Sequence, residues 1–535
     1  MNFTSNKIYA SLFFFVFLFS IVLNTININT IKSDTSGRYT NKLVHDSTIR
    51  SVDNPWYTTQ IKHYLNGDGF TIDPSDPIMS VRRTPGYPIF YGIHYALLGE
   101  ETAHRVIPYT QAIIFALSAV VFGLTVSLVS KSAIAGYLSA LMYGTSIFFI
   151  GFLFYTVTEA IHPSIVVFSL YFAAKYFYSD RQYQNKYIFL SAIFCAIATL
   201  VRPTDGVLLV TLSLALLVNS RLSIRDRIRS IFIVIVAFGI MFMPWVVHNY
   251  TKIGKIVILE AYYESEPFGG FGVKHTALIN WWLAWGDPGG SPDTPSALGL
   301  HAQISEDTNT KNKYNTINRF VDKIVPEYAY IDYSREDLRS AFYLYQDCIE
   351  TRLKKYSDRT SKLDLEIARE IWGPGTKPID LMKEKWGEKP LECEAHVETI
   401  FNGFEDKIKY GSPLRYYVIS PFFVRGVQYI FHSNTNELSF LNPADRKFNN
   451  FQFFTKAFFY VINVLLWLFS VLYLFLKRSY TEKVLLGSFF VFTFLFLSYF
   501  RWVEVRYMLA AYPFMYLMSS VLIINILRKI KLIEK

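Results

Sequence analysis

Acidic and arginine side chains stand at the ends of apolar runs in several distant parts of this 535-residue chain. The charged residues in these positions are Asp53, Glu159, Arg82, Arg83, Arg202 and Arg506. Charges beside membrane segments are costly unless they serve structure or function. A carboxylate can take a proton from a hydroxyl group or bind a metal, and guanidinium groups grip phosphate oxygens. The residue types therefore predict a site that handles an anion and a proton.

Each of these residues also has a purely structural interpretation. Arg202 or Arg506 taken singly fits a headgroup contact or a snorkelling side chain. Glu159 fits a cap in the first turn of a helix, and Asp53 followed by Asn54 and Pro55 is a good helix opening. Their convergence on one side of the membrane favours a shared site, because chance placement would scatter them over both sides.

The elements that must position these residues are long apolar segments. A membrane-spanning helix needs roughly 20 apolar residues, and the runs are far too long for barrel strands. We therefore expect a polytopic α-helical membrane protein with about ten transmembrane helices. The spans are expected near residues 8–28, 106–129, 133–152, 157–178, 187–201, 204–219, 230–248, 453–476, 483–500 and 506–527.

The distribution of Lys and Arg predicts the orientation of the chain. The basic connections include residues 219–230 and the tail 528–535, and basic loops stay on the cytoplasmic side. Both termini are then cytoplasmic in a multi-pass protein of the inner (plasma) membrane, and the active site is extracytoplasmic. The net charge of +10 is explained by basic residues in the cytoplasmic connections, so we do not take it as a sign of nucleic-acid binding.

This topology divides the chain into five parts. They are a first transmembrane helix (1–29), a first external loop with interfacial helices near 56–65 and 87–98 (30–105), transmembrane helices 2–7 (106–250), an extracytoplasmic domain (251–452), and transmembrane helices 8–10 with a cytoplasmic tail (453–535). The extracytoplasmic domain is expected to be α+β or mostly helical. Its Cys348 and Cys393 can pair in an oxidising compartment or stay apart, and the sequence leaves both open.

No Walker-type loop, HExxH or CxxC motif occurs in the chain. A substrate handled on the outer face cannot draw on cytosolic ATP or nucleotide sugars. We therefore expect a lipid-linked substrate that has already crossed the membrane.

Taken in order, the short motifs resemble those of the GT-C glycosyltransferases over roughly residues 1–260 and 453–527. They are similar to the family 39-like branch, which holds aminoarabinose lipid A transferases and protein O-mannosyltransferases. The matching segments are Asp53 with Tyr57, Leu65-Asn66-Gly67-Asp68-Gly69-Phe70, Arg83-Thr84-Pro85-Gly86-Tyr87-Pro88-Ile89-Phe90, Thr158-Glu159, Arg202-Pro203, Pro244-Trp245, His248-Asn249-Tyr250 with Gly254, and Glu504 with Arg506-Tyr507 and Pro513.

The resemblance implies transfer of a sugar, usually with inversion, from a polyprenyl-phosphate donor to an envelope lipid, glycan or protein acceptor at the extracytoplasmic membrane face. Asp53 would then be the general base, with Glu159 assisting it or orienting the sugar. Arg83 is the first choice for the donor phosphate, followed by Arg82, Arg202 and Arg506. The binding site for the sugar or lipid would be lined by Trp56, Tyr57, Tyr87, His248, Asn249, Glu504 and Tyr507.

The chain departs from the family pattern in three places. Asn54 stands where many members have a second acid, so a divalent metal is left open, its ligands are unknown, and no cofactor is assigned. His248 stands where an arginine is frequent. The block 251–452 has no match, and it is either a rigid cap or the part that selects the acceptor.

Two other functions compete with a sugar transferase. An oligosaccharide ligase or polymerase would also work on lipid-linked glycans, but it lacks this order of motifs. A membrane transporter predicts inverted repeats and broken helices near the bilayer midplane. The chain shows no internal repeat, and its charges stand at helix ends.

Overall fold

The computed structural model describes residues 3–35, 42–51, 53–74, 80–178, 184–259, 272–286, 300, 310–357, 392–442, 447–500 and 504–530. It forms two compact units. The first comprises Met1–Ala261, Ile430–Thr493 and Val505–Lys535, and the second comprises Tyr262–Tyr429 with Phe494–Glu504. Each unit is described by itself.

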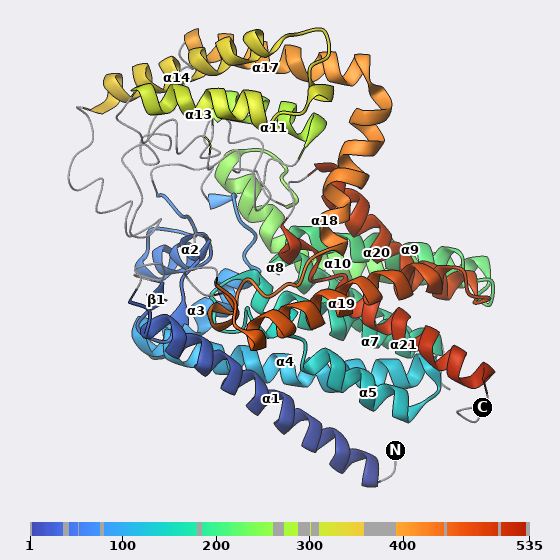
Figure 1. Ribbon diagram of the computed structural model, residues 1–535. Coiled ribbons are helices and arrows are strands. Elements are labelled where there is room, and N and C mark those ends of the chain that lie inside the picture. The colour runs from blue at the N-terminus through green and yellow to red at the C-terminus, as the bar shows by residue number, and fades with distance from the viewer. Residues whose placement is uncertain are drawn as a thin grey trace. The chain divides into compact units, whose positions relative to one another are not determined.

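Helices long and apolar enough to cross a membrane dominate the first unit (Figure 1). Six satisfy both conditions in the part of the chain described: α1 (Phe3–Lys32), α4 (Glu100–Ser130), α5 (Ala133–Gly144) continued by α6 (Ile147–Ile150), α10 (Ile224–Ile253), α19 (Asn450–Leu474) and α20 (Tyr480–Phe500). The other expected spans are also helices: α7 (His162–Tyr178), α8 (Asn185–Val201), α9 (Val207–Leu217) and α21 (Tyr512–Lys529). The polytopic helical class is confirmed, and the count of ten crossings stays a prediction.

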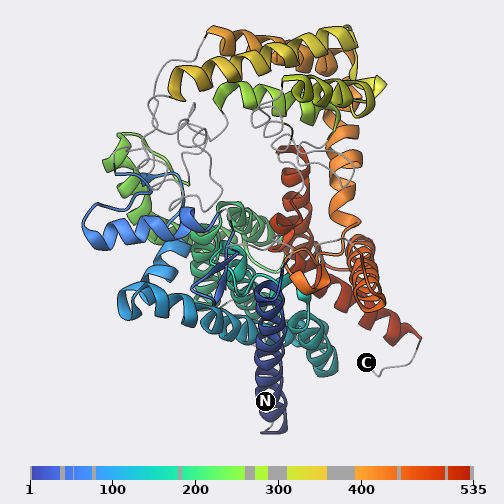
Figure 2. The ribbon, with the colours of Figure 1, turned by 60° about the vertical axis from the view of Figure 1, so that its left-hand side comes forward.

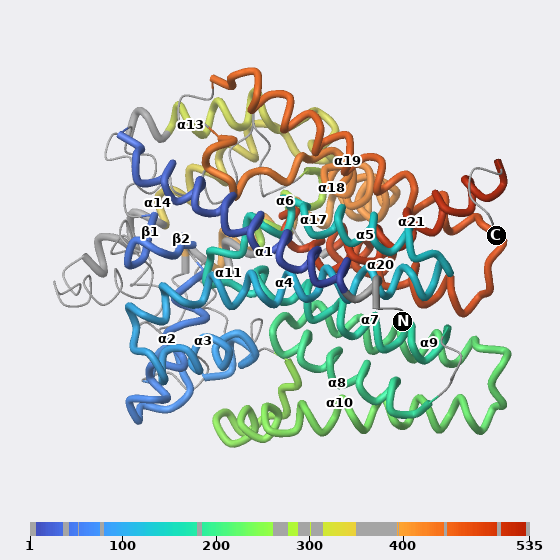
Figure 3. The backbone as a smooth tube through the Cα atoms, turned by 90° about the horizontal axis from the view of Figure 1, so that it is seen from below, coloured from blue at the N-terminus to red at the C-terminus, as the bar shows by residue number. Residues whose placement is uncertain are grey.

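Close helix packing holds the centre of this unit together. Helix α4 packs against both α5 and α7, α7 packs against α8, and α8 packs against α10 (Figures 1 and 3). A Cβ atom on Gly123 of α4 would stand 2.8 Å from the carbonyl oxygen of Gly136 in α5. Small residues of this kind let membrane helices approach closely, where van der Waals contact replaces the hydrophobic drive of water.

Short elements form much of the segment between residues 42 and 98. The hairpin of β1 (Leu43–Val44) and β2 (Thr48–Ile49) precedes α2 (Asn54–Asn66) and α3 (Gly86–Leu98). Pro55 lies in the first turn of α2, and Gly67 ends the helix with a φ of 92°, as proline and glycine favour. Both helices occur where the sequence predicts helices in this segment.

Two helices of the bundle begin later than expected. Helix α7 begins at His162 instead of residue 157, and α21 begins at Tyr512 instead of residue 506. Pro163 and Pro513 favour the first turn of a helix, where the missing N–H costs nothing. The preceding residues form the 3₁₀ turns η2 (Thr158–Ala160) and η7 (Val505–Met508). A third such turn, η6 (Ser439–Leu441), is bound to α1 through the side chain of Asn27.

The described residues of the second unit form helices joined by short non-helical connections, so of the two expected classes the mostly helical one is observed. Aromatic side chains such as Trp281, Trp282, Phe320, Phe342 and Phe401 fill its core. Figure 2 shows its helices lying side by side. They are α11 (Gly272–Trp285), α13 (Thr310–Lys323), η4 (Glu327–Ala329), α14 (Arg335–Ser357), α17 (Glu392–Gly411) and the π-helix η5 (Arg415–Gly426), and α18 (Val427–Ile430) follows at the unit's edge.

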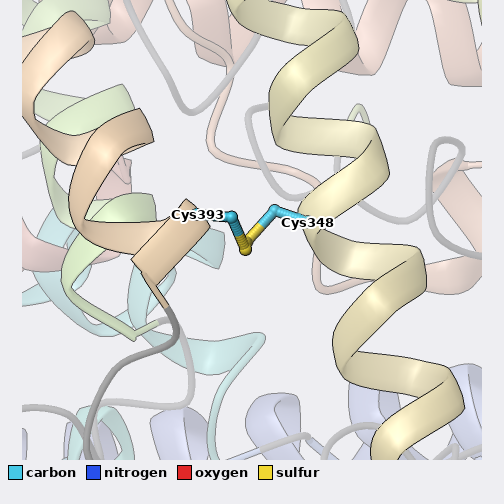
Figure 4. Close-up of a disulfide and its surroundings, with 2 residues drawn as sticks. All are labelled: Cys348 and Cys393. Carbon is cyan, nitrogen blue, oxygen red and sulfur yellow. A yellow bond between two sulfur atoms is a disulfide. The ribbon is translucent and has the colours of Figure 1, made fainter.

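A disulfide joins Cys348 of α14 to Cys393 of α17, with the two Cα atoms 5.7 Å apart (Figure 4). Of the two alternatives that the sequence leaves open, the structure therefore has the paired one. The bond closes a loop across a sequence separation of 45 residues. Cys195, in α8, is free and buried.

We expect Cys348→Ser to lower the free energy of unfolding of the second unit by about 4 kcal/mol, because the unfolded chain regains the entropy of an open loop of this length. Thermal unfolding of the purified full chain, with and without reductant, measures this. Cys195→Ala is the control and should keep the wild-type sensitivity to reductant. An unchanged melting temperature in Cys348→Ser would contradict the assignment.

Candidate active site

Proline determines where Arg202 stands. Helix α8 ends at Val201, and Arg202 adopts an extended backbone with φ −144° and ψ 111°. The residue before a proline avoids the helical conformation, so Pro203 ends the helix there. The turn η3 (Pro203–Gly206) then leads into α9. The guanidinium of Arg202 is thereby placed at the end of α8.

Arg202 and Glu159 form a buried ion pair. Arg202 Nη1 lies 2.8 Å from Glu159 Oε1, and the two side chains are only 8% and 3% exposed. The Thr158 hydroxyl donates to the other oxygen, Glu159 Oε2, at 3.0 Å. Glu159 is therefore not a helix cap, and its carboxylate is used in a side-chain cluster between η2 and the end of α8.

Arg506 extends this cluster to Asp53. Arg506 Nη1 donates to Asp53 Oδ2 at 2.7 Å, and Arg506 Nε lies 3.6 Å from Glu159 Oε1. Asp53 is the N-cap residue of α2, but its side chain makes no capping hydrogen bond. The helix-opening interpretation therefore does not account for its carboxylate. Asp53, Arg506, Glu159 and Arg202 form one continuous chain of alternating charge, built from four distant segments.

The arginines also set the charge state of Glu159. Burial alone would raise the pKa of this carboxyl, but Arg202 and Arg506 outweigh burial and hold its pKa below the usual range. Glu159 therefore stays ionised. Since it is negative and enclosed, its contribution is to hold the two guanidinium groups, not to donate a proton.

Arg82 and Arg83 lie against the aromatic side chains of α2. The Arg82 guanidinium carbon stands 4.3 Å from the centre of the Trp56 ring, and that of Arg83 stands 5.7 Å from Trp56 and 5.9 Å from Tyr57. Cations over aromatic faces at such distances are attracted by the ring quadrupole. Trp56 and Tyr57 follow Asp53 by three and four positions, so the stacking places two positive side chains against the first turn of the helix that Asp53 precedes.

Tyrosines connect the two groups of charges. Burial raises the pKa of Tyr57 to about 12, so its phenol stays protonated, and Arg83, Asp53, Glu159 and Arg202 all act on it electrostatically. Tyr507 lies under both Arg202 and Arg506, with guanidinium carbons 4.8 Å and 5.5 Å from its ring centre. Tyr57 and Tyr507 therefore belong to the same site.

Gly86 brings the arginine-bearing segment against α8. A Cβ atom at this position would stand 2.5 Å from the backbone carbon of Leu200 and 2.5 Å from the backbone nitrogen of Val201. Only glycine permits this approach without displacing the backbone. The start of α3 thus contacts the last turn of α8, directly before Arg202, and this contact explains the glycine in the segment from Arg83 to Phe90.

Two of the expected lining residues, His248 and Asn249, make their hydrogen bonds to backbone atoms of other segments. His248 Nε2 is 3.2 Å from the carbonyl oxygen of Ser80, and its ring stacks on Trp245. Asn249 is buried and donates to the carbonyl oxygen of Val257 at 2.8 Å, which is a structural role. Glu504 is partly exposed and is the last residue assigned to the second unit.

Gln111 positions the residues around the site and was not found from the sequence. It is buried in α4, where its amide donates to the carbonyl oxygens of Leu153 and Tyr155 and accepts from the Tyr87 hydroxyl at 2.8 Å. It therefore fixes both Tyr87 and the segment that leads to Glu159. A polar residue inside an apolar span was the available signal.

A second buried pair runs beside the first and was also missed. His162 Nδ1 is 2.9 Å from Asp205 Oδ2, with exposed fractions of 0% and 1%. His162 follows Glu159 by three residues, and Asp205 follows Arg202 by three. The two pairs therefore link the same two segments twice, which holds Glu159 and Arg202 in register.

The acids of the site face arginines. Among the described residues, no group of three or more His, Cys, Asp or Glu is arranged to hold a metal ion. The structure therefore gives no ligand set from which to derive a step through a metal.

Comparison with known proteins adds a family to this geometry. Residues 83–260 match the Alg9-like mannosyltransferase family. This is a GT-C glycosyltransferase family, so the GT-C resemblance drawn from the sequence is confirmed over this third of the chain. The matched segment includes Arg83, Glu159 and Arg202 but neither Asp53 nor Arg506. No curated protein matches the chain.

Two solved structures illustrate what the whole chain is similar to. The archaeal oligosaccharyltransferase AglB from Archaeoglobus fulgidus, in complex with an inhibitory peptide and a dolichol-phosphate, has 12% identity and a TM-score of 0.44 over 99% of this chain and 52% of its own. This chain thus spans about half the length of AglB. ArnT from Cupriavidus metallidurans, bound to undecaprenyl phosphate, has 11% identity and a TM-score of 0.34 over 96% and 77%.

We expect Asp205→Ala to lower the free energy of unfolding by about 3 kcal/mol, because breaking a buried pair leaves its other member without a partner. Thermal unfolding in detergent measures the change. Ser169→Ala is a matched control, since the Ser169 hydroxyl donates to the carbonyl oxygen of Ser191 between α7 and α8, and its loss should cost only about 1 kcal/mol. Equal effects of the two substitutions would argue against a specific His162–Asp205 pair.

Proposed function

We propose that this protein is a membrane glycosyltransferase that moves a sugar from a polyprenyl-phosphate donor to an acceptor hydroxyl at the extracytoplasmic face. The observation that carries the proposal is the chain of charges Asp53–Arg506–Glu159–Arg202. Two of its members lie within the segment that matches the mannosyltransferase family. It supplies a base and cations, which are the groups that such a transfer needs.

Asp53 is the better placed of the two acids to act on the acceptor. Its side chain is 21% exposed, whereas that of Glu159 is 3% exposed. The acceptor oxygen would bond to the anomeric carbon while the bond from that carbon to the phosphate oxygen breaks. Asp53 takes the hydroxyl proton, and the electron pair leaves with the polyprenyl phosphate. Glu159 would act by holding Arg202 and Arg506.

Several features support an anionic leaving group at this site. Arg82 and Arg83 are oriented by Trp56 and Tyr57, and the protonated Tyr57 phenol can donate to a phosphate or sugar oxygen. The starts of α2 and α3 lie next to these arginines, and helix starts carry partial positive charge. A phosphate leaving group needs this cationic surrounding more than it needs a proton.

The second unit is proposed to select the acceptor on the extracytoplasmic side. Its Cys348–Cys393 disulfide supports an oxidising compartment. The excess of Lys and Arg in residues 219–230 and 528–535 supports cytoplasmic termini in the inner membrane.

We expect Asp53→Asn to reduce sugar transfer by roughly a hundredfold or more, because the amide cannot accept the acceptor's proton. The assay measures radiolabelled sugar passing from a polyprenyl-phosphate donor to envelope acceptors in membranes. Asp46→Asn is the matched control, since Asp46 is an exposed residue of the same loop with a φ of 53° that asparagine tolerates. Undiminished transfer by Asp53→Asn would remove Asp53 from the role of base.

We expect Arg83→Ala to weaken binding of polyprenyl phosphate at least tenfold, since a charge-assisted hydrogen bond contributes roughly 1.5–3 kcal/mol. Titration of the purified protein with undecaprenyl phosphate measures the affinity. Arg105→Ala removes a more exposed arginine, paired with Glu101 on α4, and should leave the affinity unchanged. Normal binding by Arg83→Ala would place the phosphate elsewhere.

A further inference from the structure

Arg506 is shared between two acids that differ in accessibility. Its Nη1 binds Asp53 Oδ2 at 2.7 Å, and its Nε lies 3.6 Å from Glu159 Oε1. The Arg506 and Asp53 side chains are 23% and 21% exposed, whereas Glu159 is 3% exposed. The outer half of this arrangement is therefore open to a substrate, and the inner half is enclosed.

The inner pair is held from several sides. Arg202 Nη1 contacts Glu159 at 2.8 Å and lies 3.5 Å from the Thr158 hydroxyl, and its guanidinium stacks on Tyr507. Separating this pair would leave buried charges without compensation, at a high cost. The Arg202–Glu159 pair is consequently the fixed part of the site.

The outer pair is more exposed, although Arg506 also lies over the Tyr507 ring. The Asp53 carboxylate makes no capping hydrogen bond to its own helix, and Arg506 is its single hydrogen-bond partner within the described residues. A partly exposed ion pair contributes little to stability. Arg506 can therefore leave Asp53 without disturbing α2, while Glu159 keeps the Nε side of the Arg506 guanidinium near the site.

This contact occupies part of the group proposed to act as the base. The Arg506 N–H occupies Asp53 Oδ2, so while this ion pair stands only Oδ1 of the carboxylate is left to face a hydroxyl group. A phosphate that arrives at the site is a second anion with oxygens suited to the same guanidinium fork. Asp53 and the phosphate therefore compete for one cation.

We propose that Arg506 is a donor-sensitive latch on Asp53. It holds the carboxylate in the empty protein, and the donor phosphate draws the guanidinium away and leaves Asp53 ready to accept a proton. The inference rests on the proposed function and adds its regulation. After the transfer step, Arg506 meets the charge that the electron pair brings to the leaving phosphate, and Asp53 holds the proton from the acceptor.

Competition for Arg506 predicts an effect on phosphate binding that a purely structural role of Asp53 would not produce. If Asp53 and phosphate compete for Arg506, removal of the Asp53 charge must strengthen phosphate binding, since coupling between two ligands is reciprocal. We expect Asp53→Asn to bind undecaprenyl phosphate about tenfold more tightly than wild type, a change of about 1.4 kcal/mol. Arg506→Gln should bind it more weakly, and the double variant should match Arg506→Gln.

The experiment titrates the four full-length proteins in lipid nanodiscs with undecaprenyl phosphate and reads the Kd, so it does not depend on turnover. Glu101→Gln is the matched control, because it removes an acid from an exposed ion pair with Arg105 and should leave the Kd unchanged. Asp53→Ala must tighten binding as Asp53→Asn does, and thermal unfolding checks that each variant is folded.

The outcomes separate the latch from the function on which it rests. Unchanged or weaker binding by Asp53→Asn overturns the latch, and so does tightening that persists in the double variant. In either case, weaker binding by Arg83→Ala and Arg506→Gln would still support the donor site. Wild-type affinity in both of these arginine variants would overturn the donor site itself.

Discussion

Compensation of buried charge is the constraint on which this site depends. Two acids and two arginines meet where the surroundings exclude most water, and an ionised group there persists only beside a partner of opposite sign. The consequence appears in the gradient of exposure, from the enclosed Glu159 and Arg202 to the more open Asp53 and Arg506. The Glu159–Arg202 end of the chain of charges is the rigid end, and the Asp53–Arg506 end is the one that can rearrange.

Proline is the local device that brings these charges together. Asp53, Arg83, Glu159, Arg202 and Arg506 each precede a proline at or near a helix start: Pro55, Pro85, Pro163, Pro203 and Pro513. Because proline favours the first turn of a helix, these helices begin after the charged residues, and Arg202, directly before Pro203, is also kept out of the helical conformation. Their side chains then extend beyond the helix ends and can meet one another.

Much of this arrangement was predictable from the sequence. Apolar runs predicted helices at all the expected spans, and the placement of Asp53, Glu159, Arg202 and Arg506 at one end of these runs predicted their approach. The helix starts near 157 and 506 were placed too early because apolar residues continue up to the proline. The His162–Asp205 pair and the role of Gln111 depend on contacts between distant segments, which hydrophobic periodicity does not encode. His248 and Asn249 match a motif by order, but their hydrogen bonds are to the backbone.

The contact between Asp53 and Arg506 joins residues 453 positions apart. A ribosome adds the arginine only after nearly the whole chain has entered the membrane. Until then the growing polypeptide carries the acidic side chain of Asp53 without the cation that completes the pair. Assembly of the site is thus coupled to the end of synthesis, and chains that stop short of residue 506 are incomplete at this place even where all the earlier helices have formed.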